Sequence, residues 1–332
     1  KDARGNSVTS RYFDPESVSP DDFEFADGGL ARPGYRSGKS VKGIMDVVKN
    51  KRTISEIRDS KHSGEKMVYM SVPDYTSAKW AELGGVDVAV AGDSLAMIAH
   101  GFSNTIPATM DMMVMHSSAI RRGAPNTFVL GCMPYQSYNT VDRALLNATR
   151  FMQEAGVDAV KPQGGKSQAN ILRSLVDAGI PTASHIGLTP HTVAMFGGFK
   201  IQGRTADSAM RILEDALAIQ DAGCFMLEFE AVPDGVAKVI TKELEIPTIG
   251  IGAGVNTDGQ ILLCHDLLGV FTDFKPKFTK RYAKLTEVAV DGIAAYVKDV
   301  KTGQFPDEDH SYSIEEAELE KFQSLVEKRR QI

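Results

Sequence analysis

Short apolar runs rich in β-branched residues alternate with longer amphipathic segments from Lys66 onward. The apolar runs predict eight strands, the last of them the least distinct, at residues 67–72, 86–91, 127–133, 159–161, 182–185, 225–230, 248–251 and 268–271. The longer segments space their apolar residues helically and predict helices at residues 76–83, 111–121, 141–155, 168–178, 206–222, 234–244 and 258–264. Strands that alternate with helices in this way indicate βα units and a parallel sheet.

Eight such units favour a closed barrel over an open sheet. Together they span roughly 220 residues, close to the ~250 residues typical of a (β/α)8 TIM barrel. A doubly wound open sheet is the competing arrangement, but no GxGxxG follows the first strand and no P-loop occurs. Gly156, Gly179 and Gly223 end three predicted helices directly before the next strand. We therefore predict an α/β fold, a (β/α)8 TIM barrel.

The same pattern divides the chain into three segments. A polar N-terminal extension, rich in Gly, Ser, Asp and Pro, occupies residues 1–51, and helical spacing begins within it at Val41. The barrel forms the catalytic domain at residues 52–315, and a helical tail occupies residues 316–332. We therefore expect one catalytic domain with a flanking segment on each side.

Composition narrows the class of protein and of partner. The 332 residues are 42% hydrophobic and 24% charged, which supports a full apolar core. The formal net charge is -6 and the basic residues are scattered, which favours a small-molecule partner over nucleic acid or a membrane surface. Cys132, Cys224 and Cys264 are isolated, which indicates a reducing compartment. Since no run reaches the roughly 18–20 apolar residues of a membrane span, we expect an intracellular protein of the cytoplasm or mitochondrial matrix.

Polar side chains stand at the ends of most predicted strands, where a TIM barrel places its active site. In strand order they are Asp93 and Ser94, Cys132, Lys161 and Gln163, His185, and Glu228 and Glu230. Because these strand ends meet at one rim of a barrel, we expect the side chains to converge there. They are the candidate site residues of the chain.

Each of these residues also has a structural interpretation. Asp93 follows a glycine and can cap a helix or form a turn, and His185 can be a hydrogen-bonded core histidine. The glycine-rich segment at residues 252–254 can be only a tight loop. Lys161 and Glu230 are harder to explain structurally, because a charge within an apolar run is costly unless it is paired or used.

Several ordered segments resemble the ketopantoate hydroxymethyltransferase family. They are VAGDSL at residues 90–95, RRGAPN at 121–126, HIGLTP at 185–190, FGGFKIQGR at 196–204, IGIGAG at 249–254 and TDGQIL at 257–262. The resemblance extends roughly from Arg52 to Ser313. It implies a magnesium-dependent transfer of a hydroxymethyl group from 5,10-methylenetetrahydrofolate to 3-methyl-2-oxobutanoate in pantothenate biosynthesis. It also implies that the protein is a homo-oligomer.

The resemblance implies roles for individual residues. Glu230, in the segment FEAVP, matches the family's general base, which removes a proton next to the ketone. Lys161 matches a lysine suited to pair with the substrate carboxylate, and we expect it to do so without forming a Schiff base. Asp93 and Ser94 match a substrate-binding pair, and His185 completes the expected catalytic set.

Three positions depart from the family pattern. The family's metal ligands are carboxylates at the ends of the second, third and fourth strands, of which the chain keeps Asp93 and replaces two by Cys132 and Gln163. Magnesium prefers hard oxygen ligands, so we expect a site that binds Mg2+ weakly or not at all. Glu228 stands where the family usually has an apolar residue, and it can supply a replacement carboxylate or pair with Lys161.

A softer ion is the alternative to magnesium. Asp93, Cys132 and His185 together form a ligand set that is acceptable for Zn2+. Whether the three side chains can approach one ion does not follow from their positions in the sequence.

Three functions are compatible with the sequence. The first is enolate-type carbon–carbon chemistry on a small 2-oxo acid, that is, hydroxymethyl transfer with an altered metal site. The second is a diverged aldolase-like or lyase-like enzyme that acts on another substrate with little or no metal. The third is a non-catalytic relative that binds a ligand without converting it. Metal content separates the first two, and binding without turnover would identify the third.

Overall fold

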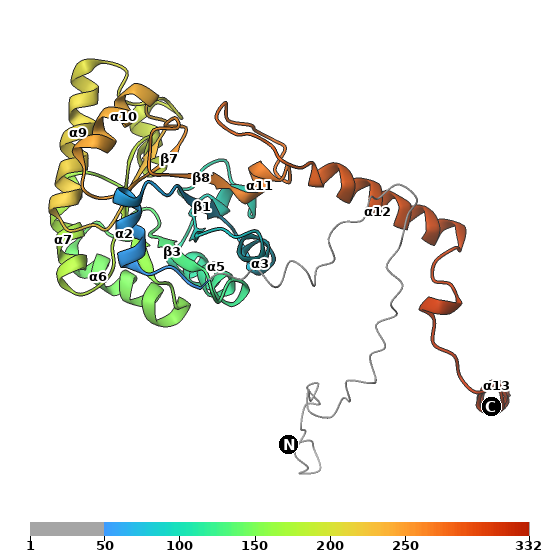
Figure 1. Ribbon diagram of the computed structural model, residues 1–332. Coiled ribbons are helices and arrows are strands. Elements are labelled where there is room, and N and C mark those ends of the chain that lie inside the picture. Colours follow the sequence, from blue (N-terminus) through green and yellow to red (C-terminus); the bar gives the residue numbers. More distant parts are fainter. Residues whose placement is uncertain (1–49, 332) are drawn as a thin grey trace, which may run out of the picture. The chain divides into compact units, whose positions relative to one another are not determined.

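The structure is a computed structural model that describes residues 50–331 (Figure 1). Its eight strands are β1 Met67–Ser71, β2 Val88–Ala91, β3 Phe128–Cys132, β4 Ala159–Lys161, β5 Ser184–Gly187, β6 Leu227–Glu230, β7 Thr248–Ile251 and β8 Gly259–Leu263. The part of the predicted N-terminal extension before residue 50, including the helical spacing from Val41, lies outside the described residues.

The strands form one parallel sheet in the order β4-β3-β2-β1-β8-β7-β6-β5. Each strand except β4 pairs with the next one along the chain, and β1 pairs with β8. Two isolated parallel bridges, Val160 with Thr182 and Gln163 with His185, connect β4 to β5 and nearly close the sheet. This order confirms the predicted TIM barrel and excludes a doubly wound sheet, in which strand order reverses at a switch point.

Helices separate the strands, and side-chain caps explain where several of them begin. The α-helices are α2 Ile54–Ser63, α3 Tyr75–Leu83, α4 Leu95–Ile98, α5 Met110–Gly123, α6 Val141–Arg150, α7 Ala169–Asp177, α8 Val193–Phe196, α9 Ala206–Asp221, α10 Asp234–Glu243, α11 Cys264–Leu267, α12 Leu285–Thr302 and α13 Glu316–Arg330. The side chains of Thr53, Asp74, Thr109, Thr140 and Thr205 each accept a hydrogen bond from a first-turn amide. Such a cap stabilises a helix by about 1 kcal/mol.

The eighth strand was predicted at the wrong place. Residues 258–264 were expected to be helical and residues 268–271 to be the strand, but β8 is Gly259–Leu263. Gly259 explains the difference, because a Cβ on this residue would lie 2.5 Å from the carbonyl oxygen of Met67 in β1. Only a glycine allows this close backbone approach. The apolar pattern of a five-residue strand also resembles that of one helix turn.

The barrel strands are almost completely buried. Every residue of β2, β3, β4 and β7 is buried, as expected of parallel strands that are covered on both faces. Gly131 in β3 illustrates the packing, because a Cβ there would lie 2.7 Å from the ring of Phe151. Within residues 50–331, no helix combines the length and the apolar character needed to cross a membrane.

Candidate active site

The structure brings all the sequence-predicted site residues together in one cavity of about 1140 Å³. The cavity is lined by Asp93, Ser94, Cys132, Lys161, Gln163, His185, Glu228 and Glu230, among others. Most of them lie at or just beyond the carboxyl ends of β2, β3, β4 and β6, whereas His185 and Glu228 lie within β5 and β6. The convergence follows from the barrel, because successive parallel strands end at the same rim.

Lys161 on β4 and Glu228 on β6 form a buried ion pair. The Lys161 ammonium donates to Glu228 Oε2, and the two side chains are 4% and 5% exposed. Burial opposes the Lys161 charge, but Cys132, Glu228 and Asp93 outweigh burial and raise the pKa of Lys161 above its ordinary value. Burial likewise opposes the Glu228 charge, but Lys161 and His185 lower the pKa of Glu228. Of the two roles expected for Glu228, the structure shows the pairing with Lys161.

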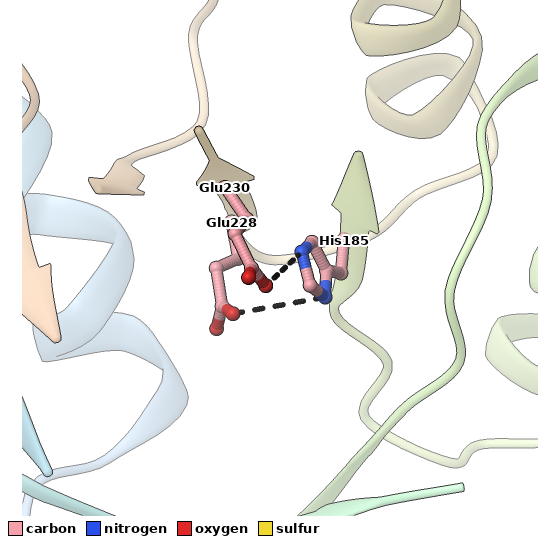
Figure 2. A group of neighbouring side chains, drawn as sticks. All are labelled: His185, Glu228 and Glu230. Atoms are coloured by element: carbon pink, nitrogen blue, oxygen red, sulfur yellow. Dashed lines mark ion pairs between the residues drawn. The ribbon is translucent and has the colours of Figure 1, made fainter. Parts of the chain in front are cut away.

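His185 on β5 lies beside two carboxylates of β6 (Figure 2). The register pairs His185 with Glu228 and Gly187 with Glu230, so the imidazole is beside both acids. Its Nδ1 lies 3.7 Å from Glu228 Oε1, and its Nε2 lies 3.2 Å from Glu230 Oε2. Neither approach is a hydrogen bond, and the buried Nε2 has no hydrogen-bond partner among the described residues. His185 is therefore not a hydrogen-bonded core histidine.

Backbone constraints fix the position of Glu230 relative to His185. A Cβ on Gly187 would lie 2.4 Å from the Glu230 carbonyl oxygen, so glycine is required where β5 meets the end of β6. Gly187 also has φ 90°, a left-handed conformation that glycine adopts readily. Ala231 follows Glu230 with φ 48°, a conformation that costs an alanine on the order of 1 kcal/mol. The strand therefore turns sharply just after the candidate base.

Asp93 belongs to a hydrogen-bond network that sequence reasoning missed. Its Oδ2 lies 2.8 Å from His191 Nε2 and accepts from Gln163 Nε2 at 3.3 Å. His191 Nδ1 lies 2.7 Å from the Tyr138 hydroxyl oxygen, which accepts a hydrogen bond from the backbone amide of Gln163 at 3.2 Å. The Gln163 side-chain oxygen accepts from the His191 amide at 3.2 Å, which closes the network. The Asp93 carboxylate thus bonds to these residues rather than capping α4.

The network also sets protonation states. Because a carboxylate only accepts hydrogen bonds, His191 Nε2 carries the proton that is shared with Asp93. Burial opposes the Asp93 charge, but the hydrogen bond and charge of His191, with Lys161 and His185, lower the pKa of Asp93. His191 and Tyr138 come from turns after β5 and β3, where no strand pattern marked them.

The residues at the three expected ligand positions do not fit a magnesium site. Asp93 Oδ2 already accepts two hydrogen bonds, and Gln163 presents amide hydrogens to it. Burial raises the pKa of the Cys132 thiol to about 12, although Lys161 acts in the opposite direction. A neutral thiol and an amide are poor ligands for Mg2+, which prefers hard oxygen donors.

Comparison with known proteins places the chain in a family. Residues 51–308 match the family model described as ketopantoate hydroxymethyltransferase. The chain is 79% identical over 284 residues to 3-methyl-2-oxobutanoate hydroxymethyltransferase 1 of Methylibium petroleiphilum, covering 86% of this chain and 97% of that protein. It is 45% identical over 262 residues to 3-methyl-2-oxobutanoate hydroxymethyltransferase of Thermus thermophilus, covering 79% and 100%.

Solved structures show the same fold at much lower identity. Phosphonopyruvate hydrolase matches with a TM-score of 0.52 and 10% identity, over 85% of this chain and 98% of that one. 2,3-Dimethylmalate lyase matches with a TM-score of 0.50 and 15% identity, over 82% and 98%. These matches concern the barrel alone, whereas the family match and the 79% identity concern the whole catalytic region. The chain belongs to the ketopantoate hydroxymethyltransferase family and is an enzyme of the hydroxymethyltransferase type.

Proposed function

We propose that this enzyme performs enolate-type carbon–carbon bond formation on a small 2-oxo acid, the transfer of a hydroxymethyl group to 3-methyl-2-oxobutanoate. The observation that carries the proposal is the position of Glu230 at the end of β6, where it lines the cavity with a side chain 17% exposed. A partly exposed carboxylate at this position can reach a substrate, whereas Glu228 is held by Lys161.

Each of the site residues in the cavity has its own role in the reaction. Glu230 takes the proton from C3 of the 2-oxo acid, and the electrons of that bond become the C2–C3 double bond of the enolate. Lys161 keeps its charge and has N–H groups beyond the one given to Glu228, so it binds the substrate carboxylate as an ammonium. Asp93 and Ser94 line the same cavity and contact the substrate, while His185 contacts Glu230 and completes the catalytic set.

The size and the lining of the cavity suit 5,10-methylenetetrahydrofolate as the donor of the hydroxymethyl group. A five-carbon 2-oxo acid fills only a small part of about 1140 Å³, a volume at the upper end of ligand pockets. Phe199, Phe274 and Phe278 line it beside the exposed cations Lys200, Arg204 and Lys277. Aromatic faces bind a heterocycle and the cations attract its anionic tail, so both parts of a folate find complementary surfaces.

A diverged reaction is the second candidate, and a specific observation favours it. Cys132 and Gln163 remove two of the family's three carboxylate ligands, so the chemistry on this barrel depends little on Mg2+. Another aldol or retro-aldol reaction on a different 2-oxo acid would use the same base. Zn2+ at Asp93, Cys132 and His185 is a metal alternative that the residue types allow.

The test distinguishes recognition of the 2-oxo acid from use of the folate as hydroxymethyl donor. Candidate 2-oxo acids are incubated with the enzyme in D2O, with metal added or chelated, and deuterium incorporation at C3 is followed by NMR. We expect exchange into 3-methyl-2-oxobutanoate without a donor, and product formation only when 5,10-methylenetetrahydrofolate is added. Exchange into another acid alone would support the diverged enzyme. Binding of the acid without exchange or turnover would instead identify a non-catalytic relative.

We also infer that the chain self-associates. No residue of α12 is buried, yet the helix exposes the apolar side chains of Val288, Val290, Ile293, Tyr296, Val297 and Val300. A large exposed apolar surface usually marks a contact with another protein. Light scattering of the purified chain would test the inference, and a monomer at micromolar concentration would contradict it.

A further inference from the structure

Three potential ligand atoms converge where β5 and β6 end. One ligand atom from each of His185, Glu228 and Glu230 lies within 4.8 Å of the other two (Figure 2). His185 Nε2 is buried and has no hydrogen-bond partner within the described part of the chain. Lys161 holds Oε2 of Glu228, so Oε1 of this carboxylate stays directed toward the imidazole. The cluster therefore offers lone pairs that no protein donor satisfies.

The contact between His185 and Glu230 has a separation that two ligands of one metal ion can have. His185 Nε2 and Glu230 Oε2 are 3.2 Å apart but not aligned for hydrogen bonding. Two donors that bind one Zn2+ ion at about 2.0–2.2 Å lie roughly 3–3.5 Å apart at tetrahedral or octahedral angles. The observed separation matches this range.

The positions expected for the family's metal show the opposite arrangement. Oδ2 of Asp93 accepts hydrogen bonds from His191 and Gln163, and burial keeps the Cys132 thiol protonated. Protein donors thus occupy Oδ2 of Asp93, whereas His185 Nε2 and Glu228 Oε1 accept no hydrogen bond from the residues that the structure describes.

The charge of the cavity also favours an added cation. Asp93, Glu228 and Glu230 line it as three carboxylates, and Lys161 is the one ammonium buried among them. The three carboxylates outnumber this one ammonium, which favours the binding of a divalent cation. Lys161 would act as the outer partner that orients a ligating carboxylate, as is common around metal sites.

We propose that His185, Glu228 and Glu230 bind a divalent transition-metal ion of the Zn2+, Co2+ or Mn2+ class. One imidazole and two carboxylates form a ligand set that these ions accept more readily than Mg2+ does. The site lies on β5 and β6 and includes none of Asp93, Cys132 and Gln163. The proposal concerns the resting enzyme, and its test does not measure turnover, so a failure would leave the role of Glu230 as base open to its own test.

The test is metal binding by the full chain after exhaustive chelation. Zn2+ binding is measured by calorimetry and Co2+ binding by visible absorption, for the wild type and three variants. We expect one ion per chain, at least tenfold weaker binding in Glu228→Gln and in Glu230→Gln, and unchanged binding in Cys132→Ser. Circular dichroism checks folding, and the partly exposed Glu230 keeps the test decisive if Glu228→Gln unfolds.

Two results would overturn the proposal. One is the absence of stoichiometric Zn2+ or Co2+ binding in the folded wild type. The other is a strong thiolate-to-cobalt charge-transfer band that disappears in Cys132→Ser, because it would place the ion at Asp93, Cys132 and His185 instead.

Discussion

Removing one member of the Lys161–Glu228 pair should destabilise the barrel more than removing both. Lys161→Met leaves Glu228 buried beside the other carboxylates of the cavity, whereas Glu228→Met leaves Lys161 with Asp93 still nearby. Breaking a buried pair from one side costs about 3–5 kcal/mol, because an unpaired charge remains. We expect Lys161→Met at the upper end of this range and Glu228→Met near its lower end.

The double variant decides whether the pairing itself is the cause. Lys161→Met with Glu228→Met removes both charges and fills similar volume, a change that is often neutral or even stabilising. We therefore expect the double variant to be more stable than either single variant, with a coupling energy of at least about 2 kcal/mol. The free energy of unfolding is measured in urea at one protein concentration, because self-association makes apparent stability depend on concentration.

A surface pair is the matched control. Lys166 and Glu214 approach to 3.3 Å, but their side chains are 69% and 55% exposed. Methionine substitutions there should change the free energy of unfolding by no more than about 1 kcal/mol, because exposed pairs contribute little. If the two buried single substitutions simply added in the double variant, the pair would not be coupled and the reasoning would be wrong.

Four further predictions follow from the site. Glu230→Gln should keep fold and substrate binding but lose about 10² to 10⁴ in rate, and near-normal turnover would remove Glu230 from its role. Borohydride with a 2-oxo acid should trap no adduct on Lys161, because its raised pKa keeps the amine protonated; mass spectrometry of the peptide checks this. Cys132→Asp with Gln163→Glu should increase Mg2+ affinity in calorimetry, and unchanged affinity would contradict the weakened-site interpretation. The pKa of Glu228 is lowered in the folded state. Its contribution to the free energy of unfolding is therefore present above the ordinary carboxyl pKa near ~4.3 and is lost as pH falls below it. The free energy of unfolding should thus fall less steeply with decreasing pH in Glu228→Gln.

Alternation of apolar runs and helices was sufficient to predict the barrel. β4 and β7 begin and end at the predicted residues, and the other strands before β8 differ by a few residues at their ends. β8 was missed because its strand character comes from contact with β1, where Gly259 packs against Met67. A contact between segments far apart in the chain leaves no periodic signal within either one.

The site was predictable to the extent that it depends on strand ends. Polar residues at consecutive strand ends must share a rim, so their meeting in one cavity follows from topology. His191 and Tyr138 lie in turns, and only the folded chain brings them to Asp93. The sequence likewise left two roles open for Glu228, a replacement carboxylate or a partner of Lys161, because the pairing depends on the length and direction of the Lys161 side chain.

The incomplete closure between β4 and β5 has a consequence for internal motion. Isolated bridges join this pair, with backbone hydrogen bonds made by the amides of Val160, Gly164 and Ala183, whereas continuous ladders join the other neighbouring strands. Local opening draws on segments with few backbone hydrogen bonds, and amide hydrogens there exchange with solvent earliest. Gln163 and His185 face each other across this boundary, and Gln163 also lines a second cavity of about 290 Å³. Local opening of the barrel at this boundary would occur within the active site and let water exchange between the two cavities that Gln163 lines.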